Sequence, residues 1–248
     1  MDLIAAVREY PPGSFFVLCA LQFHSFNQIL RKTILKKEEV TMNNYVITRD
    51  KFMSVKETKT LMKVCRKKAE ADYRENRITW INRYMLIHLA LHSGLRVSEI
   101  AALKIGDLHF NGQENYLIVQ CGKRGKKRDV YIDTEVVMHL QNYIKIKNEL
   151  WKESVDNDAP LFAGRGGNHF TTTALEISFK KAIEKAGLPK TYSIHNSRHT
   201  YATFLLAKSK NIRFVQKQLG HASMSMTCLY ADVLPEMNQK LAEAFLKY

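Results

Sequence analysis

The sequence is poor in the features that mark membrane, secreted and zinc-binding proteins. Its four cysteines lie far apart and form no Cys-x-x-Cys pair, which excludes the common zinc-binding spacing and favours reduced thiols over a disulfide framework. The early hydrophobic run FFVLCAL has seven residues, whereas a membrane-spanning helix needs about 20. The acidic start before this run is unlike a secretory signal. We therefore expect a cytoplasmic protein with no membrane partner.

Acidic residues are also few. The 24 Asp and Glu residues are outnumbered by 38 Lys and Arg residues, which gives a formal net charge of +14 and a pI near 9.6. Residues 1–50 hold six basic and five acidic residues, so 32 basic and 19 acidic residues remain for residues 51–248. Such an excess attracts polyanions, nucleic acid foremost, although some proteins of membrane surfaces share it. The charge therefore assigns a polyanion partner to the later segment.

The chain divides near Lys51 into an extension and a main domain. Residues 1–50 show no clear periodicity and contain the break YPPG. Met42 offers an alternative translation start that would leave the preceding segment outside the fold. Ser54 and Glu57 form the pattern S-x-x-E, which is typical of a helix start. We predict an N-terminal extension over residues 1–50 and a folded domain over residues 51–248.

The periodicity of the main domain predicts a mainly α fold with one small antiparallel β-sheet (α+β). The nearly all-apolar stretch RITWINRYMLIHLALHSG indicates a buried central helix that ends at Gly94. Two strand-like runs, NYLIVQC and KRDVYI, flank GKRGKK and predict a hairpin. Further helices are expected over residues 55–73, 98–103, 134–150, 171–186, 196–208, 211–219 and 222–230, and an amphipathic stretch, PEMNQKLAEAFLKY, ends the chain.

Basic and proton-exchanging side chains recur in short motifs along this domain. Arg96 follows a Gly-Leu break, His195 and Arg198 lie three positions apart, His221 follows Leu-Gly, and Tyr230 lies near the end. Taken singly, each has an ordinary structural explanation, such as a salt bridge or a helix cap. Together they suit a phosphate, because arginine forks match its oxygens and histidine exchanges protons near neutrality. The set contains no carboxylate trio for a metal, so we expect neither a metal nor a cofactor.

The predicted hairpin carries a dense group of basic residues at its tip. Around Lys123 lie four more, namely Arg124, Lys126, Lys127 and Arg128. Taken alone, such a run is a solvated face or a non-specific phosphate contact. We expect these four neighbours to contact DNA phosphates.

The segments SGLRVSEIAALKIGD, CGKRGKKRDVYI, IHNSRHTYATFLL and VQKQLGHASMSMTCLYADV resemble the successive active-site boxes of the tyrosine recombinase (phage integrase) family. Their order of Arg, Lys, His-x-x-Arg, His and Tyr is the order of that family, and the resemblance covers about residues 51–235. It implies the catalytic-domain fold of the family. It also implies a site-specific recombinase or integrase that cuts and rejoins DNA without metal or ATP.

The resemblance implies a role for each matching residue. Tyr230 would attack the scissile phosphate and form a 3′-phosphotyrosyl link. Arg96 and Arg198 would hold the non-bridging oxygens and stabilise the charge that gathers there. His221 would add a hydrogen bond to the phosphate, and His195 would assist proton movement at the tyrosine.

Three further residues receive supporting or alternative roles. Lys123 would protonate the leaving 5′-oxygen from the hairpin tip, although a slip of the hairpin would exchange it with Lys126 or Lys127. Glu99 is expected to buttress the turn that bears the first arginine. His199 is expected to turn away from the phosphate and to act as a buried hydrogen-bonding support.

The family also implies partners. These are two double-stranded DNA recombination sites, a homotetramer formed on them by exchange of the C-terminal helix, and accessory DNA-bending proteins. Packing of that helix on its own domain is an equal alternative. Residues 1–50 are too short for the helical core-binding domain of the family. Two other functions stay open: a DNA-binding regulator derived from an integrase with weak or no activity, and a type IB topoisomerase.

Overall fold

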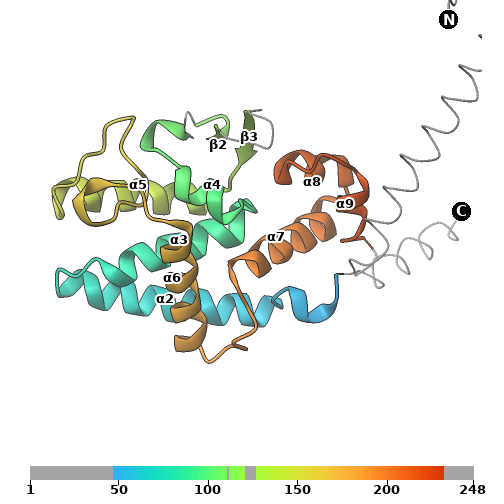
Figure 1. The fold of residues 1–248 in the computed structure, drawn as a ribbon, viewed down its shortest axis with the longest axis horizontal. Coiled ribbons are helices and arrows are strands. Elements are labelled where there is room, and N and C mark those ends of the chain that lie inside the picture. Colours follow the sequence, from blue (N-terminus) through green and yellow to red (C-terminus); the bar gives the residue numbers. More distant parts are fainter. Residues whose placement is uncertain (1–46, 111, 121–126, 232–248) are drawn as a thin grey trace, which may run out of the picture. The chain divides into compact units, whose positions relative to one another are not determined.

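The computed structural model describes residues 47–110, 112–120 and 127–231. It shows a mainly helical domain with a small sheet at one edge (Figure 1), which confirms the predicted fold class. In this part of the chain no helix is long and apolar enough to cross a membrane. The elements in chain order are η2 (Arg49–Lys51), α2 (Val55–Arg74), α3 (Thr79–Ser93), α4 (Val97–Ala102), η3 (Ile105–Asp107), β1 (Leu108–Phe110), β2 (Asn115–Val119), β3 (Arg128–Tyr131), α5 (Thr134–Glu149), η4 (Arg165–Gly167), α6 (Thr172–Lys185), α7 (Ile194–Ser209), α8 (Ile212–Leu219) and α9 (Ser225–Cys228).

Helix α3 lies at the centre of the domain because apolar side chains cover it on nearly all sides. Leu86, Ile87 and Leu89 are at most 1% exposed, as expected for a helix buried among neighbours. It contacts α2, α5, α6 and α7. As predicted, it ends at Gly94, whose φ of +63° is left-handed. A side chain at this position would collide with the ring of Tyr201 on α7, so the glycine lets α7 approach the end of α3.

The sheet has three antiparallel strands in the order β1–β2–β3. Strands β2 and β3 form the predicted hairpin, with Leu117 opposite Val130, and its tip, residues 121–126, lies outside the described residues. The sequence does not reveal β1, because three residues are too few to show alternation. Side chains alternate along a strand, so Arg128 shares a face of β3 with the fully buried Val130. This places Arg128 on the side of the hairpin that faces the domain.

Helix α7 begins two residues earlier than predicted, at Ile194. The reason is a reciprocal cap in which the Ser193 N–H donates to Oδ1 of Asn196 at 2.7 Å. Asparagine takes the place that glutamate has in the usual capping box, so the cap escapes a search for S-x-x-E. As a result, His195 lies inside the first turn of the helix.

A second, smaller group of buried apolar residues packs α7 against α8. Its members are Ile47, Phe52, Ala202, Leu206, Val215, Leu219 and Tyr230. The helix expected over residues 222–230 is the single turn α9, so Tyr230 follows its end. Tyr230 is 2% exposed within this group, and the packing of α7 and α8 therefore sets its position.

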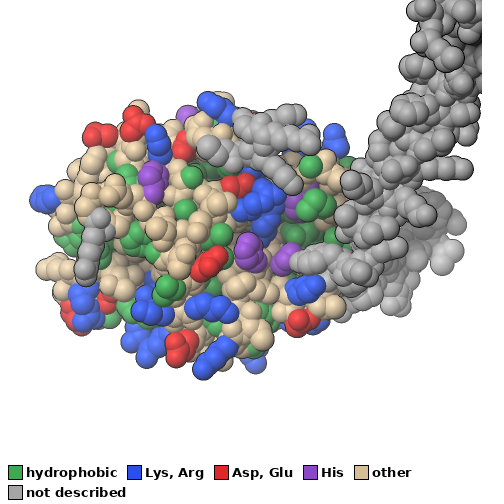
Figure 2. Space-filling view, in the orientation of Figure 1, with side chains coloured by type: hydrophobic (Ala, Val, Ile, Leu, Met, Phe, Trp, Pro, Cys, Tyr) green, Lys and Arg blue, Asp and Glu red, His purple; other side chains and the backbone are tan. Residues whose placement is uncertain are grey.

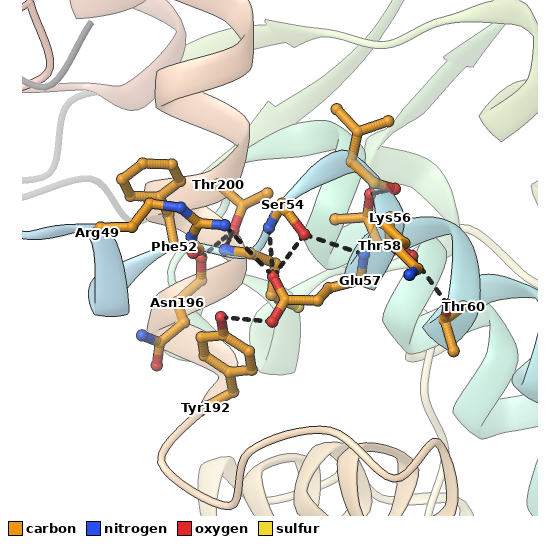
Figure 3. A network of polar contacts seen from close by, with 12 residues as sticks. Arg49, Phe52, Ser54, Lys56, Glu57, Thr58, Thr60, Tyr192, Asn196 and Thr200 are labelled. Atoms are coloured by element: carbon orange, nitrogen blue, oxygen red, sulfur yellow. Dashed lines mark hydrogen bonds and ion pairs between the residues drawn. The ribbon is translucent and has the colours of Figure 1, made fainter.

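The segment that enters α2 also holds the start of α7 in place (Figure 3). Glu57 closes the predicted capping box with Ser54 and accepts a hydrogen bond from the Tyr192 hydroxyl at 3.0 Å. The Met53 N–H donates to Oγ1 of Thr200 at 2.9 Å. These bonds lie just before α7 and in its second turn, so they fix the rotation of the helix that carries the His-x-x-Arg motif.

Candidate active site

Two arginines from different segments share one buried carboxylate. Arg96 caps α4, and its backbone N–H and its Nη1 donate to the two oxygens of Glu99 at 2.8 and 2.9 Å. From β3, Arg128 donates through Nη1 and Nη2 to the same oxygens at 2.8 and 2.9 Å. Glu99 therefore buttresses the Arg96 turn, as predicted, and it also joins that turn to the hairpin.

The Glu99 carboxylate is ionised at any physiological pH. Burial alone would raise its pKa, but hydrogen bonds from Arg128 and the Arg96 backbone, together with both positive charges, lower the pKa to about 2. Because donors occupy both of its oxygens, this carboxylate repels an approaching anion far less than an unpaired one would.

A third arginine, Arg198 on α7, is almost fully buried beside them. Its Nη1 and Nη2 donate to the carbonyl oxygens of Gly94 at 2.5 Å and Leu219 at 2.7 Å, which anchors it between the ends of α3 and α8. Burial and then the charge of Arg96 lower its pKa to about 10, so it stays charged at neutral pH. A guanidinium has five N–H donors, and these two bonds use two of them.

Tyr230 completes the group from the C-terminal side. Its hydroxyl oxygen lies 3.0 Å from Nδ1 of His199. Its ring is nearly parallel to that of His221, with centroids 6.2 Å apart. Nδ1 of His221 lies 2.9 Å from Oγ1 of Thr227, which orients that ring. The phenol is also close enough to Arg198 to influence the pKa of the guanidinium.

The positive charge of the site comes from its arginines and not from its histidines. Burial, followed by the charge of Arg198, lowers the pKa of His199 to about 4 and that of His221 to about 3, so both rings are neutral at pH 7. Figure 2 shows Lys, Arg and His side chains gathered in the region bounded by α4, β3, α7 and α8. The arginine cluster consists of Arg96, Arg128, Arg198 and Glu99. Three guanidinium groups against one carboxylate give this cluster an excess of positive charge, which suits an anion.

The structure brings together four of the predicted catalytic residues, namely Arg96, Arg198, His221 and Tyr230. His195 is exposed on the first turn of α7, and Lys127 is exposed just before β3. The remaining hairpin residues lie outside the described residues, namely Lys123, Arg124 and Lys126. Within the described part of the chain, no group of His, Cys, Asp or Glu side chains is arranged to hold a metal ion.

Two residues lie elsewhere than the sequence suggests. His199 is a hydrogen-bonding residue, as predicted, but its partner is the Tyr230 hydroxyl, because residues four apart share one helix face and His199 therefore lies on the side of His195. Arg128 differs from the predicted DNA contact, because only 14% of its side chain is exposed and its fork is bound to Glu99. Helix spacing and strand alternation are the two signals that point to these positions.

Gly220 is a site residue that the sequence does not reveal. It caps α8 with a φ of +64°, and an added Cβ would lie 2.8 Å from Nε of Arg128. The glycine therefore lets Arg128 pass close to the turn that carries His221. This requirement arises from the contact of β3 with α8, two segments that are distant in the chain.

The sequence and the fold of this chain are similar to those of several known proteins. The model of the Phage integrase family matches residues 51–237. Tyrosine recombinase XerC of Leptospira interrogans is 28% identical over 225 residues, which cover 90% of this chain and 67% of that protein. The crystal structure of XerA recombinase matches with a TM-score of 0.62 at 30% identity, over 76% of this chain and 62% of that one.

A structure of XerH site-specific recombinase, bound to its difH substrate before cleavage, matches with a TM-score of 0.60 at 25% identity. That match covers 72% of this chain and 50% of the XerH chain. The chain thus spans between half and about two thirds of the length of these relatives. It belongs to the phage integrase family, and its described residues have the fold of a tyrosine recombinase catalytic domain.

Proposed function

We propose that this protein is a site-specific DNA recombinase that cuts and rejoins DNA strands through Tyr230. The observation that carries the proposal is the position of Tyr230, which contacts His199 and His221 and lies close enough to the buried Arg198 for the two groups to interact electrostatically. Family membership supports the same reaction, because the relatives compared above are named recombinases. A nucleophile and an anion site from distant segments are the two parts that attack on a phosphodiester requires.

The arginines would stabilise the charge that develops during this attack. As Oη of Tyr230 bonds to phosphorus, negative charge gathers on the non-bridging oxygens. Arg96 and Arg198 would donate hydrogen bonds to these oxygens. Removal of one preorganised donor of this kind costs about 3–4 kcal/mol of activation free energy. The new 3′-phosphotyrosyl bond conserves the energy of the broken diester, so a 5′-hydroxyl can reverse the reaction without ATP.

The hairpin between β2 and β3 would supply the proton for the leaving group. Lys123 is the proposed general acid for the 5′-oxygen, and it belongs to the tip that lies between the two described strands. Arg124, Lys126 and Lys127 would contact DNA phosphates around it, which would make binding strongly dependent on salt. Arg128 would act from within the protein, because it supports Arg96 through Glu99.

The proposed partners are two double-stranded DNA sites bound by a homotetramer. The C-terminal stretch PEMNQKLAEAFLKY, which lies outside the described residues, would join neighbouring subunits. Residues 51–248 would form the catalytic domain, and residues 1–50 an extension. The reaction would take place in the cytoplasm, and accessory DNA-bending proteins would assist assembly.

A nicked suicide duplex tests the function directly. A pool of nicked duplexes with random sequence is incubated with the protein, and DNA that stays attached after denaturation is amplified and sequenced. A nick close to the cut releases a short strand and so prevents rejoining. We expect the wild-type protein to capture one group of related sequences and Tyr230→Phe to capture none.

Tyr143→Phe is the matched control, because Tyr143 on α5 is also a buried tyrosine, and its hydroxyl donates a hydrogen bond to Oδ1 of Asn82 at 2.7 Å, away from the site. It should form the adduct at a rate close to that of the wild type. DNA binding without any adduct from the wild-type protein would contradict the proposal and favour a DNA-binding regulator.

A further inference from the structure

Helix α7 carries one histidine before and one after the buried Arg198 in the sequence, and the two differ in their exposure to solvent. His195 lies in the first turn and is exposed. His199 lies one turn later, is half-buried, and has its Nδ1 at 3.0 Å from the Tyr230 hydroxyl oxygen. The centroids of the His199 and Tyr230 rings are 5.8 Å apart. The structure therefore separates a histidine that touches the reactive phenol from one that lies at the surface.

The neutral form of His199 suits a proton acceptor. Burial first, and then the charges of Arg198, His195 and Lys51, lower the pKa of this ring to about 4. A neutral imidazole has one N–H donor and one acceptor nitrogen. With the proton on Nε2, the Tyr230 O–H donates to the lone pair of Nδ1. The contact is thus the starting geometry for transfer of the phenolic proton, which requires a separation of about 2.6–3.2 Å.

We propose that Nδ1 of His199 accepts the hydroxyl proton of Tyr230 as the phenol oxygen attacks the scissile phosphate. The inference rests on the proposed function and deepens it. In the forward step the Oη–P bond forms, the bond from phosphorus to the 5′-oxygen breaks, and the phenolic proton moves to His199. The leaving 5′-oxygen takes a proton from the general acid of the hairpin. Rejoining reverses each transfer, so no further reactant is consumed.

Substrate binding would improve His199 as a base. The phosphodiester brings a negative charge to the arginine cluster, and an opposite charge nearby favours the protonated form of an imidazole. The pKa of His199 in the DNA complex should therefore lie above its value in the free protein. The titratable and charged groups that face His199 are Arg198 and His195 on α7, Lys51 in η2, and His221 and Tyr230 beyond α8.

A purely structural contact is the competing explanation, because buried tyrosine hydroxyls usually have a hydrogen-bond partner. His199→Asn separates the two, since its side-chain amide can keep a hydrogen bond near Nδ1 but cannot take a proton at these pH values. His195→Asn tests the rival assignment, because the family resemblance gives the proton movement at the tyrosine to His195, one turn earlier on the same helix face. His199→Gln is the second variant should the first fail to fold, and thermal melting reports the folding of all three.

The experiment measures single-turnover adduct formation between pH 4.5 and 8, with the nicked duplex that the wild-type protein selects. We expect His199→Asn to form the adduct about 10²- to 10⁴-fold more slowly, with unchanged affinity for the DNA. The decrease of the wild-type rate toward acidic pH should disappear in this variant. His195→Asn should keep that decrease and lose less than about tenfold in rate. Added imidazole should partly restore His199→Ala, a rescue that a structural role does not predict.

The two proposals fail in different ways. If wild-type protein forms no adduct, the proposed function falls and this inference falls with it. If only Tyr230→Phe lacks the adduct, while His199→Asn keeps the wild-type rate and acid dependence, the inference on His199 is overturned and the function stands. Loss of the acid dependence in His195→Asn instead would assign the proton to His195.

Discussion

Two groups of histidines lie in this domain, and their surroundings separate a binding site from ordinary packing. In the first, on α3 and α5, Nδ1 of His88 lies 2.8 Å from Nδ1 of His139, and the His92 ring meets that of His88 edge-on. In the second, His199 and His221 flank the ring of Tyr230. Each group thus combines buried imidazoles with close ring contacts.

Protonation does not distinguish the two groups. Burial is the main cause that lowers the pKa of His88 to about 3 and of His139 to about 4, much as it does for the histidines beside the tyrosine. The charged neighbours differ. Asp133 pairs with His92 at 2.8 Å in the first group, whereas the arginine cluster borders the second. The second group therefore lies beside an excess of positive charge that suits a phosphate, and histidines with lowered pKa values alone do not mark a site.

The largest expected effect comes from weakening the arginines that set the second group apart. Arg198→Lys keeps a charge but loses the guanidinium fork that donates to the Gly94 and Leu219 carbonyl oxygens. A lysine cannot replace the proposed two-pronged contact of this fork with a phosphate. We expect adduct formation to become about 10²- to 10³-fold slower, as measured by single-turnover kinetics on the selected duplex.

Arg83→Lys is the control for a buried arginine outside the site. Its guanidinium lies 4.2 Å from the centroid of the Trp80 ring, and its Nε donates to Ser178. This variant should lose stability and keep its cleavage rate when folded. Equal losses of rate in both variants would show that burial of an arginine, and not its place beside Tyr230, matters.

Gly220→Ala tests the link between the arginine cluster and the turn that carries His221. The new Cβ would lie 2.8–2.9 Å from atoms of Arg128, and the alanine would have to adopt the left-handed φ of this position. Gly187→Ala is matched in conformation, with a φ of +66°, but its Cβ has nothing within 4 Å. The backbone change alone costs about 1–2 kcal/mol, and urea unfolding should show this loss in both variants.

The difference between the two glycine variants isolates the contact with Arg128. Gly220→Ala should lose further stability, because Arg128 must shift, and its adduct should form about tenfold more slowly if Arg96 moves with Glu99, a loss of about 1.4 kcal/mol in barrier. Gly187→Ala should cleave at the wild-type rate. Identical stability and rate in the two variants would contradict the role given to Arg128.

Local signals in the sequence predict much of the fold. The Ser54–Glu57 cap, the helix that ends at Gly94, and the hairpin each depend on residues a few positions apart. The start of α7 escapes prediction because Asn196 performs the capping role of a glutamate. Strand β1 escapes it because its formation depends on pairing with β2 more than on its own three residues.

The site is only partly predictable for the same reason. The motifs identify Arg96, Arg198 and Tyr230 because each lies in a recognisable local pattern. The fork of Arg128 on Glu99 depends on a contact between β3 and α4, which no short pattern records. The choice between the two histidines of α7 depends likewise on where the chain after α8 places the phenol.

The smallest expected effect concerns pH and stability. His88, His139, His199 and His221 all have a folded pKa below the ordinary 6.5, so the unfolded chain binds more protons. Their contribution to stability is therefore complete above pH 6.5 and is lost as the pH falls toward 4. His139→Asn removes one such group, so its free energy of unfolding should decrease less than that of the wild type between pH 6.5 and 4.5. The difference should be on the order of 1 kcal/mol, as measured by urea unfolding.

Sulfate then distinguishes the two groups. An anion bound by the arginine cluster raises the pKa of the neighbouring His199 and His221, so it should reduce the loss of stability at acidic pH relative to chloride of equal ionic strength. The histidines on α3 and α5 have Asp133 and no arginine cluster beside them, so His139→Asn should respond to sulfate as the wild type does. Arg198→Lys should lose most of the response. A sulfate effect that disappears with His139→Asn and persists in Arg198→Lys would contradict this assignment. The anion would then bind beside the first group of histidines and not at the arginine cluster.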